Sequence, residues 1–532
     1  MRRTSWYVER ICDEVSRKEA KGGRIYNRRI MRSNMTILGE KMDLFAAKAN
    51  LLVLPVFATG ADLADVVVAR LPEAVKKSAV RLIKAHEFTG KAGEMITVDV
   101  HDAAHHHIII AGLGVAGEAT LETAREMIGN VIAVARRLGA RTLAVEIPVA
   151  PESDVAHVAE AIVVAAQLAD YAFDTYKEKN GAKRMKEMTL VIKEGRDVLR
   201  VRKAVERGCA IAGGVAVARD LVNMPAQVMT PSALAEAAER IVKEAGKNFS
   251  LKVLDKVECE ALGMGAYVAV GLGSDEPLKF LHLTYTPERS SKKRLAVIGK
   301  GVTFDSGGLS LKPGDSMMTM KCDMAGAAAV LGLFTVLGQL RPRCEVHGIV
   351  AAVENMPSGK AIRPGDIVKA SNGKTIEILN TDAEGRLTLA DALTYAKKLE
   401  PTAMVDLATL TGACVVALGE EITGLMSNND ELAQSVLDSA EDAGEKMWRM
   451  PLEKRYRSQV ESDIADLRNI ATTRYGGSLT AGLFLEEFVD GLPWVHLDIA
   501  GPAFAEKPIA SYLGKGGTGH GVRTLVELVE RM

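Results

Sequence analysis

Three stretches of the 532-residue sequence contain both charged residues and glycines. This combination favours a ligand site. The first stretch, residues 299–308, reads GKGVTFDSGG, and its only charged residues are Lys300 and Asp305. Glycines let the backbone turn sharply and approach a ligand closely. The stretch also follows an apolar run typical of a strand, and ligands of α/β sheets bind at the carboxyl ends of the strands.

The other two stretches carry further ionisable side chains. Lys312 follows the first stretch, and Asp323 precedes the apolar residues 324–329, where Asp323 alone would be a helix N-cap. Residues 380–387 read NTDAEGRL and have an ionisable residue at every second position, so in an extended chain these side chains project to one face. They are Asp382, Glu384 and Arg386. This face is either a surface strip of salt bridges or a crowded cleft, and the small residues around it favour a cleft.

Alternating strands and helices must hold these residues in place, and the alternation predicts an α/β fold with two domains. A smaller N-terminal α/β domain is expected over residues 35–195, after a basic extension over residues 1–34. A larger C-terminal α/β domain with a mixed central sheet is expected over residues 196–532, and residues 196–223 form its connecting helix. Since single cores stop growing near ~250 to 300 residues, two domains suit a chain of this length.

Hydrophobic periodicity predicts the individual elements. In the first domain, strands are expected at residues 51–57, 96–100, 106–113, 142–147 and 188–193. In the second, strands are expected at residues 251–254, 280–285, 295–298, 345–353, 403–407 and 494–499, and helices at residues 232–245, 326–340, 388–399 and 522–530. Asn372-Gly373, set between two apolar runs, predicts a two-residue hairpin and hence a mixed sheet.

The composition excludes several classes of protein. Lys plus Arg total 67 against 68 Asp plus Glu, so no general positive field draws the protein to nucleic acid or to an anionic membrane. No uninterrupted apolar run reaches the ~18 residues of a membrane helix. The six cysteines are far apart and form no CxxC pair, which indicates reduced thiols rather than a disulfide scaffold or a zinc knuckle.

Three other motifs suggest chemistry that their surroundings do not support. GLGVAG at residues 112–117 resembles a dinucleotide fingerprint, but the acid expected about 20 residues later is missing, which favours a turn without a ligand. His105, His106 and His107 cannot converge on one ion, because adjacent strand residues point to opposite faces. Gly314-Asp315-Ser316 has no histidine partner and is better explained as a turn.

Residues 299–308, 323–329 and 380–387, with Lys312, resemble the ordered signatures of the leucyl aminopeptidase family, the M17 metallopeptidases. The similarity covers nearly all of the second domain, whereas the first domain is similar only in its general α/β pattern. The resemblance implies two divalent metal ions bridged by Asp305 and Glu384. One ion would also take Asp382, and the other would also take Lys300 and Asp323.

The charges of this implied site agree with two divalent ions. Four carboxylates balance two divalent cations if Lys300 joins as a neutral amine, which alone has a lone pair for a metal. Because no His or Cys is among the ligands, Mn²⁺ or Mg²⁺ is expected beside Zn²⁺. The family mechanism implies that a metal-bridging hydroxide attacks the peptide carbonyl, that Lys312 stabilises the oxyanion, and that Arg386 holds a bicarbonate that takes the proton.

The resemblance also implies what the enzyme acts on and how it assembles. The pocket for the first residue of the substrate would be lined by Met320, Thr409, Leu410 and Gly412, and would prefer leucine-like side chains. Short peptides with a free N-terminus are the implied substrates, and a cytoplasmic homohexamer is the implied assembly.

Three alternatives stay open at this stage. The basic residues 1–34 would support a DNA-binding protein, although binding to nucleic acid is not expected. A catalytically inactive scaffold is disfavoured because all the matched site positions are intact. Redox chemistry with a nicotinamide at residues 112–117 would require tight NADH binding, and none is expected.

Overall fold

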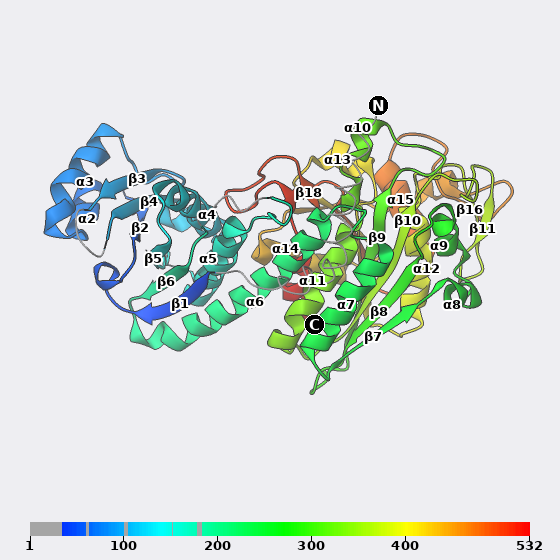
Figure 1. Ribbon diagram of the computed structural model, residues 1–532, viewed down its shortest axis with the longest axis horizontal. Coiled ribbons are helices and arrows are strands. Elements are labelled where there is room, and N and C mark those ends of the chain that lie inside the picture. The colour runs from blue at the N-terminus through cyan, green and yellow to red at the C-terminus, as the bar shows by residue number, and fades with distance from the viewer. Residues whose placement is uncertain (1–34, 60–62, 101–104, 152, 178–183) are drawn as a thin grey trace, which may run out of the picture.

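The computed structural model describes residues 35–59, 63–100, 105–151, 153–177 and 184–532. It contains two α/β units that lie side by side along the long axis of the molecule (Figure 1). The predicted fold class, a smaller N-terminal and a larger C-terminal α/β domain with a mixed sheet in the larger one, is confirmed. The domain limits at residues 35–195 and 196–532 stay a prediction, and the basic extension over residues 1–34 lies outside the described residues.

The first unit is built on a six-stranded sheet in the order β1-β6-β5-β2-β4-β3, in which only β3 runs antiparallel to its neighbour. The apolar run of β4 is buried on both faces, as expected for a central parallel strand. The strands are β1 (Thr36–Lys41), β2 (Leu51–Ala58), β3 (Met95–Asp99), β4 (His107–Val115), β5 (Thr142–Glu146) and β6 (Glu187–Ile192). Its helices are η1 (Leu44–Ala46), α2 (Leu63–Ala69), α3 (Glu73–Ala85), η2 (Ala116–Glu118), α4 (Leu121–Leu138), α5 (Val155–Asp170) and η3 (Gly195–Asp197).

A helix of 26 residues, α6 (Val198–Asn223), joins the two units and packs against α5 of the first and α11 (Ala325–Leu340) of the second. Glycine makes the contact with α11 close, since a Cβ at Gly214 would lie 2.6 Å from the carbonyl oxygen of Gly332. One continuous apolar core therefore includes residues from both units, among them Ile109 and Leu331.

The second unit is built on an eight-stranded sheet in the order β15-β14-β17-β13-β9-β10-β8-β7. β9, β10, β13 and β17 are parallel, whereas β7, β8 and β14 each pair antiparallel with a neighbour. The strands are β7 (Phe249–Leu254), β8 (Lys279–Tyr285), β9 (Arg294–Asp305), β10 (Glu345–Asn355), β13 (Ala403–Ala408), β14 (Thr423–Ser427), β15 (Met447–Arg449) and β17 (Trp494–Asp498).

Helices cover both faces of this sheet (Figure 1). They are α7 (Pro231–Ala245), α8 (Lys256–Ala261), α9 (Gly265–Val270), η4 (Gly271–Gly273), α10 (Gly314–Met317), η5 (Met320–Cys322), α11, α12 (Gly385–Lys397), α13 (Gly412–Leu418), α14 (Asp430–Ala443), η6 (Lys454–Val460), α15 (Gly477–Glu486) and α16 (Val522–Arg531). The segment Gly314–Leu340 is long and apolar enough to cross a membrane, but 83% of its most apolar window is buried inside the protein, as in a core helix.

A hairpin forms around Asn372-Gly373, but its turn has three residues (371–373) rather than the predicted two, and it does not belong to the large sheet. Its strands β11 (Ile367–Lys369) and β12 (Thr375–Glu377) form a separate small sheet with β16 (Leu467–Arg468). The large sheet is mixed because of its antiparallel strands, so the reason first given for a mixed sheet was wrong. A two-stranded ribbon of β18 (Phe504–Ala505) and β19 (Gly516–Gly517) completes the unit.

Candidate active site

The predicted site residues gather where β9 and β13 end and where α11 and α12 begin. Strand β9 was expected to end at residue 298, but it pairs with β10 as far as Asp305 and Asn355, past an irregularity at Val353 and Glu354. The glycine-rich stretch is therefore the last part of a strand rather than a loop. This places Lys300 and Asp305 on a rigid element of the sheet.

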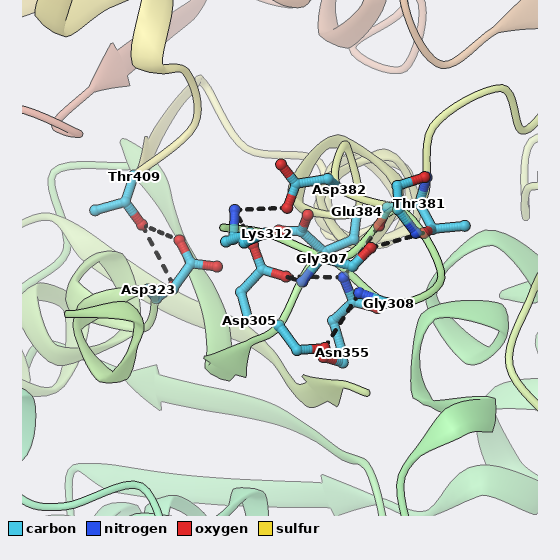
Figure 2. A network of polar contacts seen from close by, with 12 residues as sticks. Asp305, Gly307, Gly308, Lys312, Asp323, Asn355, Thr381, Asp382, Glu384 and Thr409 are labelled. Atoms are coloured by element: carbon cyan, nitrogen blue, oxygen red, sulfur yellow. Dashed lines mark hydrogen bonds and ion pairs between the residues drawn. The ribbon is translucent and has the colours of Figure 1, made fainter. Parts of the chain in front are cut away.

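Carboxylate oxygens of Asp305, Asp382 and Glu384 lie within 4.8 Å of one another (Figure 2). Residues 380–387 do not form an extended chain, the condition for a shared face, because Glu384 has helical dihedral angles and α12 begins at the next residue. Asp382 and Glu384 meet because the chain turns at the start of this helix. Asp323 is likewise not an N-cap, since it ends η5 and Met324 is the N-cap of α11.

Lys300 joins the fourth carboxylate to this group. Its Nζ donates to Asp323 Oδ1 at 2.8 Å and to the carbonyl oxygen of Thr409 at 3.0 Å, and it lies 2.8 Å from Glu384 Oε1. Burial alone lowers the pKa of Lys300, but Asp323 and Glu384 outweigh burial and hold that pKa above its ordinary value. A Cβ at Gly385 would lie 2.5 Å from Lys300 Cε, so the start of α12 needs glycine beside this side chain.

Lys312 contacts the other two carboxylates. Its Nζ lies 2.8 Å from Asp305 Oδ2 and 2.6 Å from Asp382 Oδ1 (Figure 2). Burial lowers the pKa of Lys312, and the carboxylate of Asp305 more than reverses this effect. The two lysines therefore divide the four acidic side chains into two pairs.

Several carboxylate oxygens of this cluster lack a hydrogen bond. Asp323 Oδ2 has no hydrogen-bond partner within the described part of the chain, while Asp382 Oδ1 and Glu384 Oε1 touch lysine Nζ atoms without hydrogen-bond geometry. Burial raises the pKa of Asp323, Asp382 and Glu384. Buried carboxylates with free lone pairs suit divalent cations with a preference for oxygen ligands, so the residues present fit two such ions.

A neighbouring residue that the sequence did not single out orients Asp305. Asn355, at the end of β10, donates from Nδ2 to Asp305 Oδ1 at 2.8 Å and to the carbonyl oxygen of Thr381 at 3.0 Å. Thr381 Oγ1 in turn donates to the carbonyl oxygen of Gly307 at 2.6 Å. The position of Asn355 at the carboxyl end of a strand beside β9 was the signal that could have identified it.

Arg386 lies in the first turn of α12 and is 8% exposed. Its Nε has no hydrogen-bond partner among the described residues. Burial lowers the pKa of Arg386 to about 10, against the opposing effect of Glu384 and Asp498. A buried guanidinium with an unused donor fits a small oxyanion such as bicarbonate.

The predicted pocket residues follow β13 or lie in η5. Thr409 Oγ1 donates to Asp323 Oδ1 at 2.7 Å, Leu410 packs against the apolar core beneath, and Gly412 begins α13. Met320 lies in η5, three residues before Asp323. The structure thus brings the segment after β13 into contact with the carboxylate cluster through Thr409.

The three competing motifs lie outside this cluster. Gly112 and Gly114 belong to β4 of the first sheet, and Gly314-Asp315-Ser316 begins the short helix α10 rather than a turn. The ring of His105 contacts the carbonyl oxygens of Ala49 and Phe45, so it supports the local backbone. His107 contacts Asp99 through Nδ1, so it does not join His105 at a common site.

Comparisons with known proteins agree with this geometry. Family models described as the cytosol aminopeptidase family match residues 53–180 with the N-terminal domain and residues 216–526 with the catalytic domain. A probable cytosol aminopeptidase from Cyanothece sp. is 49% identical over 84% of this chain and 90% of its own length. Another from Gloeobacter violaceus is 46% identical over 91% of this chain and 97% of its own length.

Two solved structures share the whole fold. A mutant of tomato leucine aminopeptidase is 35% identical, covers 94% of this chain and 97% of its own, and has a TM-score of 0.83. The bottromycin maturation enzyme BotP in complex with Mn is 36% identical, covers 91% of this chain and 99% of its own, and has a TM-score of 0.80.

Proposed function

Since this chain belongs to the cytosol aminopeptidase family, the M17 peptidases, and is a hydrolase of the aminopeptidase type, we propose that it uses two divalent cations to release apolar N-terminal residues from short peptides. The observation that carries this proposal is the convergence of four carboxylates on Lys300 and Lys312. Zn²⁺, Mn²⁺ and Mg²⁺ are the ions that suit these ligands, and the Mn bound in BotP supports manganese.

Asp305 and Glu384 would bridge the two ions. Lys300 and Asp323 would complete the ligands of one ion, and Asp382 those of the other. Lys300 must lose its proton to serve as a ligand, because an ammonium group has no lone pair. Two bound cations would supply a water of lowered pKa as the nucleophile and would hold the carbonyl oxygen of the substrate.

Lys312 and Arg386 would perform the remaining steps. The ammonium group of Lys312, held at the cluster by Asp305 and Asp382, can donate to the carbonyl oxygen as negative charge develops on it. Arg386 would hold bicarbonate through its unused Nε–H donor, and bicarbonate would supply a proton acceptor.

Substrate selection would rest on the segment after β13. Met320, Thr409, Leu410 and Gly412 would line the pocket for the first side chain. None of the four carries a charge, so a leucine-like side chain loses water there without leaving an ionic partner unpaired. A free α-amine would bind beside Lys300, which restricts the enzyme to unblocked N-termini.

The first experiment is hydrolysis of leucine p-nitroanilide by the purified protein, after chelation and again after Mn²⁺ or Zn²⁺ is restored. Cleavage should disappear with the metal, return with it, and be absent with N-acetylleucine p-nitroanilide. Failure to cleave with either ion would contradict the proposed function.

We also propose that the protein is a cytoplasmic homohexamer, as the family resemblance implies. The names of its relatives as cytosol aminopeptidases support the location. Size-exclusion chromatography with light scattering should give six times the mass of one 57.0 kDa chain. A stable monomer at micromolar concentration would contradict the assembly.

A further inference from the structure

Asp498, the last residue of β17, is fully buried and uses both carboxylate oxygens on the segment that follows β13. Oδ1 accepts from the backbone N–H groups of Leu410 at 3.2 Å and Thr411 at 3.4 Å, and from that of Ala500 at 3.2 Å. Oδ2 accepts from Thr411 Oγ1 at 2.6 Å. Asp498 thus ties two consecutive residues after β13 to the neighbouring parallel strand.

The same segment contacts the carboxylate cluster through the preceding residue. The carbonyl oxygen of Thr409 accepts from Lys300 Nζ at 3.0 Å, and Thr409 Oγ1 donates to Asp323 Oδ1 at 2.7 Å. Residues 409–411 are therefore held by Asp498 at one end and by the site at the other. A shift of this segment would move the pocket lining and the partners of Lys300 together.

We propose that Asp498 is a positioning residue that sets the preference for the first side chain of the substrate by fixing residues 409–411. The proposal rests on the proposed function, because it assigns Thr409 and Leu410 to the substrate pocket. The bond from Thr411 Oγ1 to Oδ2, at 2.6 Å, has the length of a strong hydrogen bond to a carboxylate, and the longer backbone N–H contacts add to it. A difference of one methylene group in a substrate changes kcat/KM by about 10- to 200-fold in a hydrophobic pocket, which requires that the pocket wall keeps its position.

The surroundings of Asp498 offset part of the cost of burying its carboxylate, although its pKa stays above the ordinary value. Burial raises the pKa of Asp498, and His496, Thr411 and the backbone donors oppose this rise. His496 lies two residues earlier on the same face of β17, where its Nδ1 lies 2.6 Å from Asp406 Oδ1. Among the described residues, Asp498 is the side chain that accepts from the backbone N–H groups of Leu410 and Thr411, while Thr411 Oγ1 also lies 2.9 Å from Ser478 Oγ of α15.

The test compares Asp498→Asn with Asp391→Asn, a matched control. Asp391 is also fully buried and accepts backbone N–H groups, from Tyr267 at 2.8 Å and Ser371 at 2.6 Å, but it does not touch residues 409–411. The measurement is the ratio of kcat/KM for leucine p-nitroanilide to that for alanine p-nitroanilide. We expect Asp498→Asn to lower this ratio about tenfold and to raise KM for leucine, and Asp391→Asn to leave both unchanged.

A loss of folded protein alone would lower kcat for both substrates and leave their ratio and KM intact. An unchanged ratio in soluble, folded Asp498→Asn, or an equal change in Asp391→Asn, would overturn the proposal. If Asp498→Asn does not fold, Thr411→Val decides, because it removes the hydroxyl donor to Oδ2. Thr411→Val should lower the leucine-to-alanine ratio, whereas Thr411→Ser, which keeps the hydroxyl, should have the ratio of the wild type. Equal ratios in these two variants would refute the role of Asp498. Inactive wild-type protein would instead contradict the proposed function.

Discussion

Each lysine of the site touches two carboxylates, and this pairing explains how four acidic side chains can lie together in a buried cluster. The two ammonium groups neutralise part of the negative charge, and divalent cations would neutralise the rest. Lys300 and Asp305 were predictable because they lie among glycines where an apolar run ends, whereas the gathering of the other residues with them was implied by the family resemblance. Asn355 and Asp498 were missed because an isolated polar residue has no motif around it, and only a position at the carboxyl end of a central strand singles out either one.

Arg386→Lys should keep metal binding and lose most of the turnover. Lysine retains the charge but presents a point donor in place of the fork that suits a planar oxyanion. A loss of 10²-fold or more in kcat, roughly the contribution of one general acid or base, is expected at unchanged metal content. Steady-state kinetics with metal analysis measure both quantities, and a wild-type kcat would contradict the role of Arg386.

Gly385→Ala should displace Lys300, because the new Cβ would lie 2.5 Å from Cε and 2.7 Å from Nζ of that lysine. A misplacement of about 1 Å can cost on the order of 10²-fold in rate. We expect a fall of that size in kcat/KM at saturating Mn²⁺. Gly359→Ala is the control, since a Cβ there meets no atom within 4 Å, and equal activity of the two variants would contradict the steric argument.

Among the helices and strands, long segments with a clear hydrophobic periodicity were predictable from the sequence. Segments whose structure depends on distant pairing partners were not. The predicted helix over residues 522–530 appears as α16 (Val522–Arg531), and the strand over 280–285 as β8. Strands β1, β14 and β15 were missed because they gain their hydrogen bonds from partners that are not adjacent in sequence. The length of β9 was underestimated because pairing with β10 outweighs the low strand propensity of its glycines.

Two histidines between β8, β10 and α12 should make stability depend on pH. His282 Nε2 lies 3.1 Å from His347 Nδ1, and its Nδ1 lies 3.1 Å from the hydroxyl of Tyr395. Burial, then His347 and Lys252, lowers the pKa of His282 from 6.5 to about 4. Below pH 6.5 the unfolded chain therefore binds a proton at His282 that the native state does not bind. The contribution of neutral His282 to stability is fully present above pH 6.5 and is lost as pH falls towards 4.

The melting temperature should fall over this pH window, and His282→Gln should flatten the fall. The contribution of one such group is at most about 1.4 kcal/mol for each pH unit. Thermal unfolding in buffers from pH 7 to pH 4 measures the effect, with the exposed His86→Gln as a control. Identical pH profiles for His282→Gln and wild type would contradict this assignment.

At the scale of the molecule, hydrogen bonds join α4 of the first unit to the segment that follows Asp498 in the second unit. Ser511 Oγ donates to the carbonyl oxygen of Glu126 at 2.9 Å, and the hydroxyl of Tyr512 donates to Glu122 Oε1 at 2.8 Å. Glycine allows this contact, because a Cβ at Gly129 would lie 2.2 Å from Ser511 Oγ and 2.8 Å from the backbone of Ser511. No sequence pattern predicts such a junction between residues almost 400 positions apart.

Gly129→Ala should therefore destabilise the junction of the two units by about 1 to 3 kcal/mol, as overpacking does elsewhere. Differential scanning calorimetry should show a lower melting temperature than for the wild type. Gly117→Ala is the matched control in the same unit, since its Cβ meets no atom within 4 Å. A wild-type melting temperature for Gly129→Ala would show that the junction contributes little.

The apolar core shared through α6 has a consequence for how substrates reach the strand ends. Opening an angle between the two sheets would expose the contacts of α6 with both α5 and α11, at about 25 cal/mol for each Å² of apolar surface. Domain motion is the default for small polar contacts, but not for a continuous hydrophobic layer. The N-terminal sheet therefore does not act as a swinging lid. Entry of peptides and exit of products therefore depend on the residues around the carboxyl ends of β9 and β13. They do not depend on a hinge between the two units.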